Sequence, residues 1–295
     1  MPSNIQLLLS DAIDYAGLFP PAKLDMVTAV QNYAAYRSGE YSWVLGRFIV
    51  PISRLAEFEK AFERLSNRGE ASWHISALAG AELDEEMATA LDFNWRHVAT
   101  GAVIDTVELK AATAADIERA GKVVPVSVLT YVEIPLEPDP SPLITMIGKS
   151  GLRAKARTGG ITPDAFPPSA QLATFIHSCV LARVSFKATA GLHHPFRGTY
   201  HLTYEPNSPS GTMYGFLNVF IATAVAQLGG SIDDVKAALE ETSPGGFQLS
   251  ENAIAWRGYR LSVPEISFLR TEHAVSIGSC SFIEPITELK ALKVL

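Results

Sequence analysis

Lys187 and two adjacent histidines lie in one short stretch, Arg183–Gly198 (RVSFKATAGLHHPFRG), and offer an amine and two imidazoles for chemistry. Polar and apolar residues alternate over the first positions, as in a β-strand whose successive side chains point to opposite faces. Gly191 then breaks the strand, and His193 and His194 follow in a loop. Because a lysine on a core strand is costly to bury without partners, we expect this stretch to form a functional site.

The chemistry open to these side chains depends on their protonation. Lys155 lies on the preceding expected strand, LRAKAR, and we expect its charge, together with burial, to lower the pKa of Lys187. A neutral lysine can attack a carbonyl carbon and form a Schiff base. His193 or His194 would then transfer protons, since an unperturbed imidazole titrates near neutral pH, and Glu133 is a second proton carrier. The alternatives are that Lys187 only binds an anion or fills the interior, and that the histidines pin the loop.

The same loop is rich in residue types that can ligate a metal, because His201 and Glu205 follow the histidine pair. Adjacent histidines seldom ligate one ion, and the sequence has neither H-x-H nor H-E-x-x-H spacing. We therefore predict no metal site and no cofactor.

Strand-like and helix-like segments alternate along the chain, which is typical of parallel β-α-β units. With an N-terminal segment we expect about eight strands, and that number and the length of 295 residues suit a single (β/α)8 TIM-like barrel domain over residues 1–295. Two stretches depart from the rhythm: a loop insertion after the Lys187 strand, Leu192–Gly211, and a small C-terminal hairpin or cap within 245–264, turning at Arg257-Gly258. The other expected strands are Val44–Val50, Trp73–Ala79, Ala102–Lys110, Val126–Ile134, Leu152–Arg157, Arg183–Thr189 and Val275–Phe282.

Charged side chains recur on one face of successive expected strands, and in a parallel barrel the polar inner positions converge at the C-terminal rim. These residues are mostly basic although the whole protein carries a net charge of −7, so we predict a cationic cavity for a phosphate or carboxylate. Backbone N–H donors would come from Gly159 and Gly160 after a strand, and from Ser210 and Gly211 at the N-terminus of the helix expected from Met213. The predicted anion-binding residues are Arg47, Glu108, Lys110, Arg157, Gly159, Gly160, Arg197, Ser210 and Gly211, and Asp14, Tyr15 and Glu284 are expected at the mouth.

The residues Phe186-Lys187-Ala188-Thr189-Ala190-Gly191-Leu192 resemble the Schiff-base strand of the deoxyribose-phosphate aldolase family of class I aldolases. That family has Phe/Ile-Lys-Thr-Ser-Thr-Gly-Phe at this place in a (β/α)8 barrel. The resemblance implies an aldolase in which Lys187 forms the Schiff base. The family's second lysine lies on the next strand, whereas here no lysine follows before Lys236, so its role would pass to Lys155.

Composition narrows the class of protein. The acidic balance argues against a nucleic-acid-binding protein, and the longest apolar window, Met213–Leu228, contains Asn218 and is shorter than the ~20 residues of a membrane span. Two cysteines, Cys179 and Cys280, and an N-terminus without a basic region favour the cytoplasm. We expect a small anionic metabolite as the partner, and a homo-oligomer stays open.

These observations favour a small-molecule enzyme of the lyase or aldolase type that acts on a phosphorylated or carboxylated carbonyl compound. Lys187 would be the nucleophile, assisted by Lys155, Glu133, His193 and His194. Two alternatives are a phosphoribosyltransferase-type enzyme, in which Lys187 is a charge clamp, and a non-catalytic protein that binds or senses a small anion. Fold alone does not choose among them.

Overall fold

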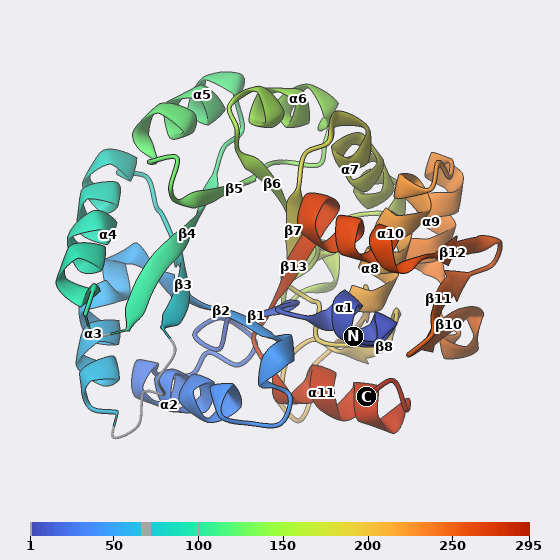
Figure 1. Ribbon diagram of the computed structural model, residues 1–295, viewed down its shortest axis with the longest axis horizontal. Coiled ribbons are helices and arrows are strands. Elements are labelled where there is room, and N and C mark those ends of the chain that lie inside the picture. The colour runs from blue at the N-terminus through green and yellow to red at the C-terminus, as the bar shows by residue number, and fades with distance from the viewer. Residues whose placement is uncertain (1, 66–71, 100) are drawn as a thin grey trace.

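Eight parallel strands close into a barrel in the computed structural model, which describes residues 2–65, 72–99 and 101–295 (Figure 1). Neighbouring strands follow the order of the chain, and the last one, β13, closes the ring between β1 and β7. The predicted (β/α)8 barrel is therefore confirmed. Its strands are β1 (Ile13–Tyr15), β2 (Leu45–Pro51), β3 (Trp73–Leu78), β4 (Ala102–Lys110), β5 (Leu129–Glu133), β6 (Arg153–Arg157), β7 (Phe186–Thr189) and β13 (Ala274–Ser279).

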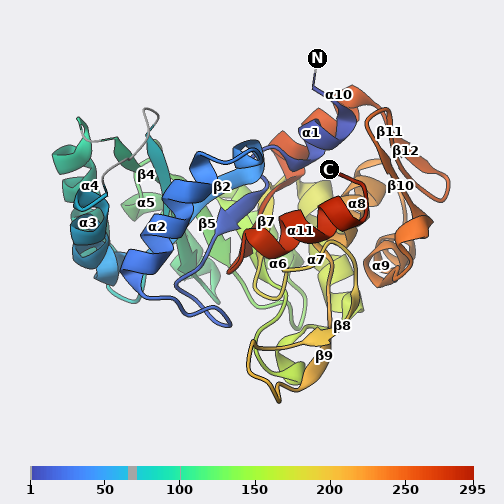
Figure 2. The ribbon, with the colours of Figure 1, turned by 90° about the horizontal axis from the view of Figure 1, so that it is seen from below.

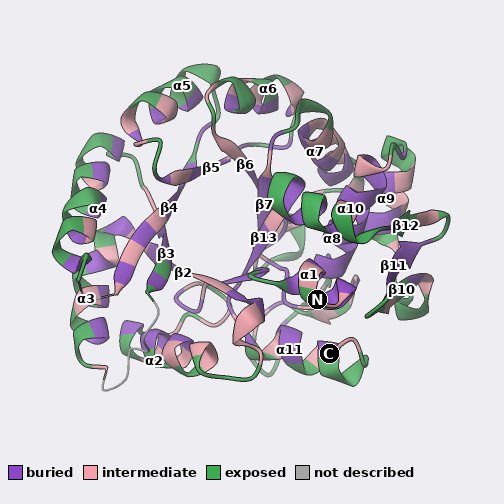
Figure 3. Ribbon diagram, in the orientation of Figure 1, coloured by how far each residue is buried: buried purple, intermediate pink, exposed green. Residues whose placement is uncertain are grey.

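Helices form the outer layer, with buried residues toward the barrel and exposed residues toward solvent (Figure 3). In α3, for example, Leu55, Phe58 and Phe62 are buried at the spacing of one helical face. α8 differs because all its residues from 216 to 226 are buried, where it packs against α7, α9 and β13. The helices are α1 (Asn4–Leu9), α2 (Met26–Arg37), α3 (Leu55–Glu63), α4 (Leu83–His97), α5 (Ala114–Val123), α6 (Ser141–Lys149), α7 (Ser169–Ala182), α8 (Phe216–Gln227), α9 (Ile232–Glu240), α10 (Val263–Phe268) and α11 (Ile283–Ala291), with short 3-10 turns at Ser42–Val44, Ile52–Arg54, Pro163–Ala165 and Pro244–Gly246 and a π turn at Leu269–His273.

Two additions extend the barrel. Strands β8 (Gly198–His201) and β9 (Ser210–Met213) form an antiparallel hairpin after β7, at the end of the molecule opposite the N-terminus (Figure 2). Strands β10 (Phe247–Ser250), β11 (Ala253–Trp256) and β12 (Tyr259–Leu261) form a small antiparallel sheet. Its second turn contains Arg257 in the left-handed conformation, with φ of 48°. The insertion and the C-terminal cap thus lie where the sequence predicted them.

Large aromatic side chains fill the space between strands β2 and β3 and helices α2 and α3. Phe48 of β2 and Trp73 of β3 pack against Tyr33, Phe58 and Phe62, with ring centroids 4.8 to 6.4 Å apart. This packing fixes the outer face of both strands, so the residues that alternate with Phe48 and Trp73 along each strand face the barrel interior. No helix within the described ranges is both long and apolar enough to cross a membrane.

Candidate active site

Lys187, on β7, is completely buried inside the barrel. Its ammonium donates hydrogen bonds to Asp14 Oδ2 and Glu108 Oε1, both at 2.6 Å, and lies 5.4 Å from the ring centroid of Tyr131. Burial disfavours the ammonium, but the two carboxylates outweigh this effect and raise the pKa of Lys187 above its ordinary value. Lys187 is therefore a charged residue held by ion pairs.

Lys155, on β6, is the direct neighbour of Lys187 in the β6–β7 register, but a carboxylate separates the two charges. Glu108 accepts from Lys187 with Oε1 and pairs with Lys155 through Oε2 at 2.8 Å, and Glu133 pairs with Lys155 at 2.8 Å. Burial favours the neutral amine, yet these carboxylates outweigh it and raise the pKa of Lys155. The expectation that Lys155 lowers the pKa of Lys187 is wrong, because Glu108 offsets the repulsion between them.

Hydroxyl and amide donors fix the two carboxylates that hold Lys187. Ser76 donates to Glu108 Oε1 at 2.7 Å, and Ser276 donates to Asp14 Oδ2 at 2.8 Å. The other Asp14 oxygen accepts from the backbone N–H of Arg47 at 2.7 Å. Burial would raise the pKa of Glu108, but the two lysines hold it below its usual value. Asp14, Glu108, Glu133, Lys155 and Lys187 thus form one connected network of ion pairs inside the barrel.

A cavity of about 390 Å³ lies at the C-terminal ends of the strands, where barrel enzymes place their active sites. Its volume suits a small molecule. Lys155 contributes to its wall, whereas Lys187 does not line it, so Lys155 supplies the amine that a ligand can reach. Strands β4 and β6, with the segments after β7 and β13, provide a polar wall, and β2 and β3, with the loop after β1, provide an apolar one. The polar wall includes Glu108, Lys155, Arg157, His193 and Cys280, and the apolar wall includes Phe19, Pro20, Ile49 and Leu78.

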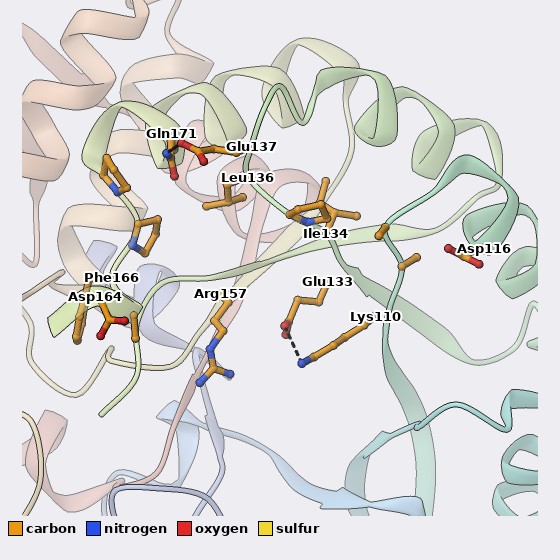
Figure 4. Close-up of a pocket in the computed structure, with 16 residues that line it drawn as sticks. Lys110, Asp116, Glu133, Ile134, Leu136, Glu137, Arg157, Asp164, Phe166 and Gln171 are labelled. Atoms are coloured by element: carbon orange, nitrogen blue, oxygen red, sulfur yellow. Dashed lines mark hydrogen bonds and ion pairs between the residues drawn. The ribbon is translucent and has the colours of Figure 1, made fainter. Parts of the chain in front are cut away.

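Arg157 lines this cavity and also a larger and more open groove of about 1010 Å³, whose lining residues are shown in Figure 4. The groove also contains Lys110 and Glu133, whose charged atoms are 3.8 Å apart. The side chain of Lys110 is 80% exposed, so Lys110 belongs to the groove and not to the predicted inner cavity. Arg157 forms no ion pair with any residue in the part of the chain that the structure describes. Its charge is therefore available to an anionic ligand.

His193 lines the cavity from the loop after β7 and is only 6% exposed. Its Nδ1 lies 3.2 Å from Ser279 Oγ and 3.6 Å from Cys280 Sγ. Burial, with a smaller contribution from the charge of His194, lowers the pKa of His193 to about 4. The imidazole is therefore neutral at pH 7 and can accept a proton from a ligand.

Arg47 lies away from the cavity, which corrects the prediction made for it. Its guanidinium donates two hydrogen bonds to Asp105, of 2.7 and 2.9 Å, and Asp105 also contacts His74 Nδ1 at 2.8 Å. Ile49, two residues further along the same face of β2, is the residue that reaches the cavity. Arg47 lies too close to the start of its strand to meet a ligand at the C-terminal mouth.

His194 and Arg197 were predicted as site residues, but neither lines the cavity. The Nδ1 atom of His194 is 2.6 Å from Glu288 Oε1, and its ring stacks on Tyr200 with centroids 3.5 Å apart. The guanidinium of Arg197 lies 4.9 Å from the ring centroid of Tyr214. These contacts hold the loop after β7 in place. For His194 they agree with the alternative interpretation, in which the histidines pin that loop.

The predicted glycine and serine contacts separate into two groups. Gly160 lines the cavity, whereas Gly159 is buried, and a Cβ there would clash with Phe166. Ser210 and Gly211 lie in β9 of the hairpin, and α8 begins only after them. Their prediction as the N-terminus of that helix is wrong, because the chain there is extended and paired with β8.

Residues Phe19–Pro21, in the loop after β1, line the cavity at the end of the barrel where the mouth was predicted. Asp14 and Tyr15, predicted there, are both buried, and Glu284 does not line the cavity. Sequence reasoning did not predict Cys280 as a site residue. Its position directly after a barrel strand was a usable signal, since catalytic residues of such barrels come from the C-terminal ends of strands.

Two comparisons with known proteins were negative: no family model matches the sequence, and no curated protein matches it. Within residues 2–65, 72–99 and 101–295, no group of three or more His, Cys, Asp and Glu side chains is placed to hold a metal ion. The barrel fold is compatible with an enzyme such as an aldolase. The reaction therefore has to be argued from the site itself.

Proposed function

We propose that this protein is a small-molecule enzyme that acts on an anionic carbonyl compound through a Schiff base on Lys155. The observation that carries this proposal is the position of the Lys155 amine, which lines the cavity between the carboxylates of Glu108 and Glu133. Lys187 lies outside the cavity wall, so we assign it to positioning Glu108 through their ion pair. Arg157, which has no carboxylate partner among the described residues, would hold the anionic group of the substrate.

Attack by Lys155 requires that its ammonium first lose a proton. Glu133, whose carboxylate lies 2.8 Å from the amine and also lines the open groove, can accept it when a ligand enters. The neutral nitrogen then bonds to the carbonyl carbon, and the carbonyl oxygen leaves as water after it is protonated. The resulting iminium withdraws electrons from the adjacent carbon, where a C–C or C–H bond can break. His193, neutral at pH 7, can take up the proton released there, which is chemistry of the lyase or aldolase type.

A second function, non-catalytic binding of a small anion, is favoured by the raised pKa of Lys155 and of Lys187, which keeps both amines charged. A phosphoribosyltransferase-type enzyme would use the same charges as a clamp. In both cases Lys155 acts through its charge alone, so arginine could replace it. A Schiff-base enzyme loses its chemistry on that replacement, because arginine does not form the covalent bond.

Borohydride reduction distinguishes these functions. The protein is incubated with pyruvate or glyceraldehyde 3-phosphate as anionic carbonyl probes, reduced, digested and analysed by mass spectrometry. We expect a stable adduct on Lys155 that is absent from the Lys155→Arg variant. Lys149→Arg, which changes an exposed lysine of α6, is the matched control and should retain the adduct.

Two outcomes would contradict the proposal. An adduct on Lys187 would move the nucleophile to that residue. Absence of any adduct, combined with thermal stabilisation by the same probes that Lys155→Arg preserves, would establish anion binding without a Schiff base.

A further inference from the structure

The cavity contains a second group able to form a covalent bond, just beyond the C-terminal ends of the neighbouring strands β7 and β13. Cys280 directly follows β13, is 4% exposed and lines the cavity. Its sulfur lies 3.6 Å from Nδ1 of His193, which lines the same cavity from the loop after β7. A thiol and an imidazole within contact distance are the arrangement that sulfur nucleophiles use.

Neighbouring side chains hold this pair in place. Tyr204 places its hydroxyl 3.8 Å from the sulfur of Cys280 and donates a hydrogen bond of 2.7 Å to Glu284. Ser279 Oγ lies 3.2 Å from Nδ1 of His193. The other ring nitrogen of His193, Nε2, has no hydrogen-bond partner among the described residues although the side chain is almost wholly buried. His193 therefore places one ring nitrogen beside the thiol and keeps the other available to a ligand in the cavity.

The protonation states define how such a pair reacts. Burial raises the pKa of Cys280 to about 11 and lowers the pKa of His193 to about 4. At pH 7 the pair is a thiol next to a neutral imidazole, not a thiolate next to an imidazolium. The nucleophile is therefore produced during the reaction, when His193 takes the thiol proton as the sulfur attacks.

We propose that Cys280 is a nucleophile of this cavity, independent of Lys155, and that it binds small anionic electrophiles covalently. The fitting class is a carboxylate with an activated carbon–carbon double bond. The sulfur bonds to the β-carbon, and the thiol proton, carried by His193, ends on the α-carbon, so nothing leaves and no oxidant is needed. Arg157 lines the same cavity and forms no ion pair with any described residue, so its charge attracts the carboxylate of the electrophile.

Iodoacetate and iodoacetamide test this proposal, because the two reagents differ mainly in charge. In each, the S–C bond forms as the C–I bond breaks, iodide leaves, and the thiol proton passes through His193 to water. Cys179 of α7 is fully buried, does not line the cavity, and serves as an internal control. We expect mass spectrometry of the folded protein to show labelling of Cys280 only. Labelling should be about tenfold faster with iodoacetate than with iodoacetamide, and should accelerate between pH 7 and 10.

Two variants test the assigned roles. Arg157→Gln should abolish the preference for iodoacetate but leave the iodoacetamide rate unchanged, and His193→Asn should slow both reagents at pH 7. No labelling of Cys280 in the folded protein, under conditions that label both cysteines after unfolding, would overturn the proposal. If wild type and Arg157→Gln showed the same preference for iodoacetate over iodoacetamide, that result would also overturn the proposal. Cys280→Ala should still form the borohydride adduct on Lys155, so failure of this proposal is distinct from failure of the lysine chemistry.

Discussion

Replacing Lys187 by methionine should strongly destabilise the fold. Methionine keeps much of the volume of lysine but removes the cation that Asp14 and Glu108 share inside the barrel. Glu108 keeps its ion pair with Lys155 at 2.8 Å, so most of the loss falls on Asp14, which keeps only hydrogen bonds. Removing one partner of a buried ion pair costs about 3–5 kcal/mol, because the remaining charge stays in a medium of low dielectric.

Urea unfolding followed by tryptophan fluorescence measures this cost as a loss in the free energy of unfolding. A loss of about 3–5 kcal/mol corresponds to a fall of roughly 5–8 °C in the thermal midpoint of a chain of 295 residues. Lys149→Met, which removes an exposed lysine, is the matched control and should change the free energy by less than about 0.5 kcal/mol.

The double variant Lys187→Met/Asp14→Asn tests the cause of the loss. Asparagine removes the carboxylate that has lost its partner, so the double variant should recover about half of the 3–5 kcal/mol. A loss below about 1 kcal/mol for Lys187→Met would refute the reasoning. So would a double variant no more stable than the single one, because the Asp14 charge would then not be the source of the cost.

Three further predictions follow from the cavity and its network. Arg157→Gln should weaken pyruvate binding at least tenfold, measured by calorimetry, because it removes the charge that attracts the carboxylate. The thermal midpoint should not change, because the guanidinium has no carboxylate partner in the described chain. An unchanged affinity would contradict the role of Arg157. Gly191→Ala should cost about 1–3 kcal/mol in urea unfolding, because Gly191 has a φ of 72° and a Cβ would lie 2.7 Å from a Phe166 ring atom. Gly151→Ala, also at positive φ but with open space around it, should cost less, and an equal loss would argue against the clash. Folding lowers the pKa of Glu108, so the stability that its charge contributes is complete above its ordinary pKa of 4.5 and declines as the pH falls below that value. Glu108→Gln should therefore weaken the fall of the thermal midpoint at acid pH. An identical fall in the variant would exclude Glu108 as its source.

The amino-acid sequence by itself determined the barrel and the inner face of its strands. Helical and strand-like segments alternate because each buries one apolar side, and this pattern is visible in short windows of residues. The two-residue period of a strand is equally local. It was sufficient to place Glu108, Glu133, Lys155 and Lys187 on the inner face, where the structure has them.

Only the tertiary structure decided how deep each side chain lies and which charges meet. Alternation assigns a residue to a face, but its height along the barrel axis depends on the stagger between strands, which no single strand contains. Arg47 was therefore predicted in the cavity, although it meets Asp105 nearer the start of its strand. Asp14 and Lys187 are 173 residues apart in the chain and come into contact only because the barrel closes. That closure places carboxylates around the two lysines that were expected to repel each other, and Lys155 is the one whose amine lines the cavity.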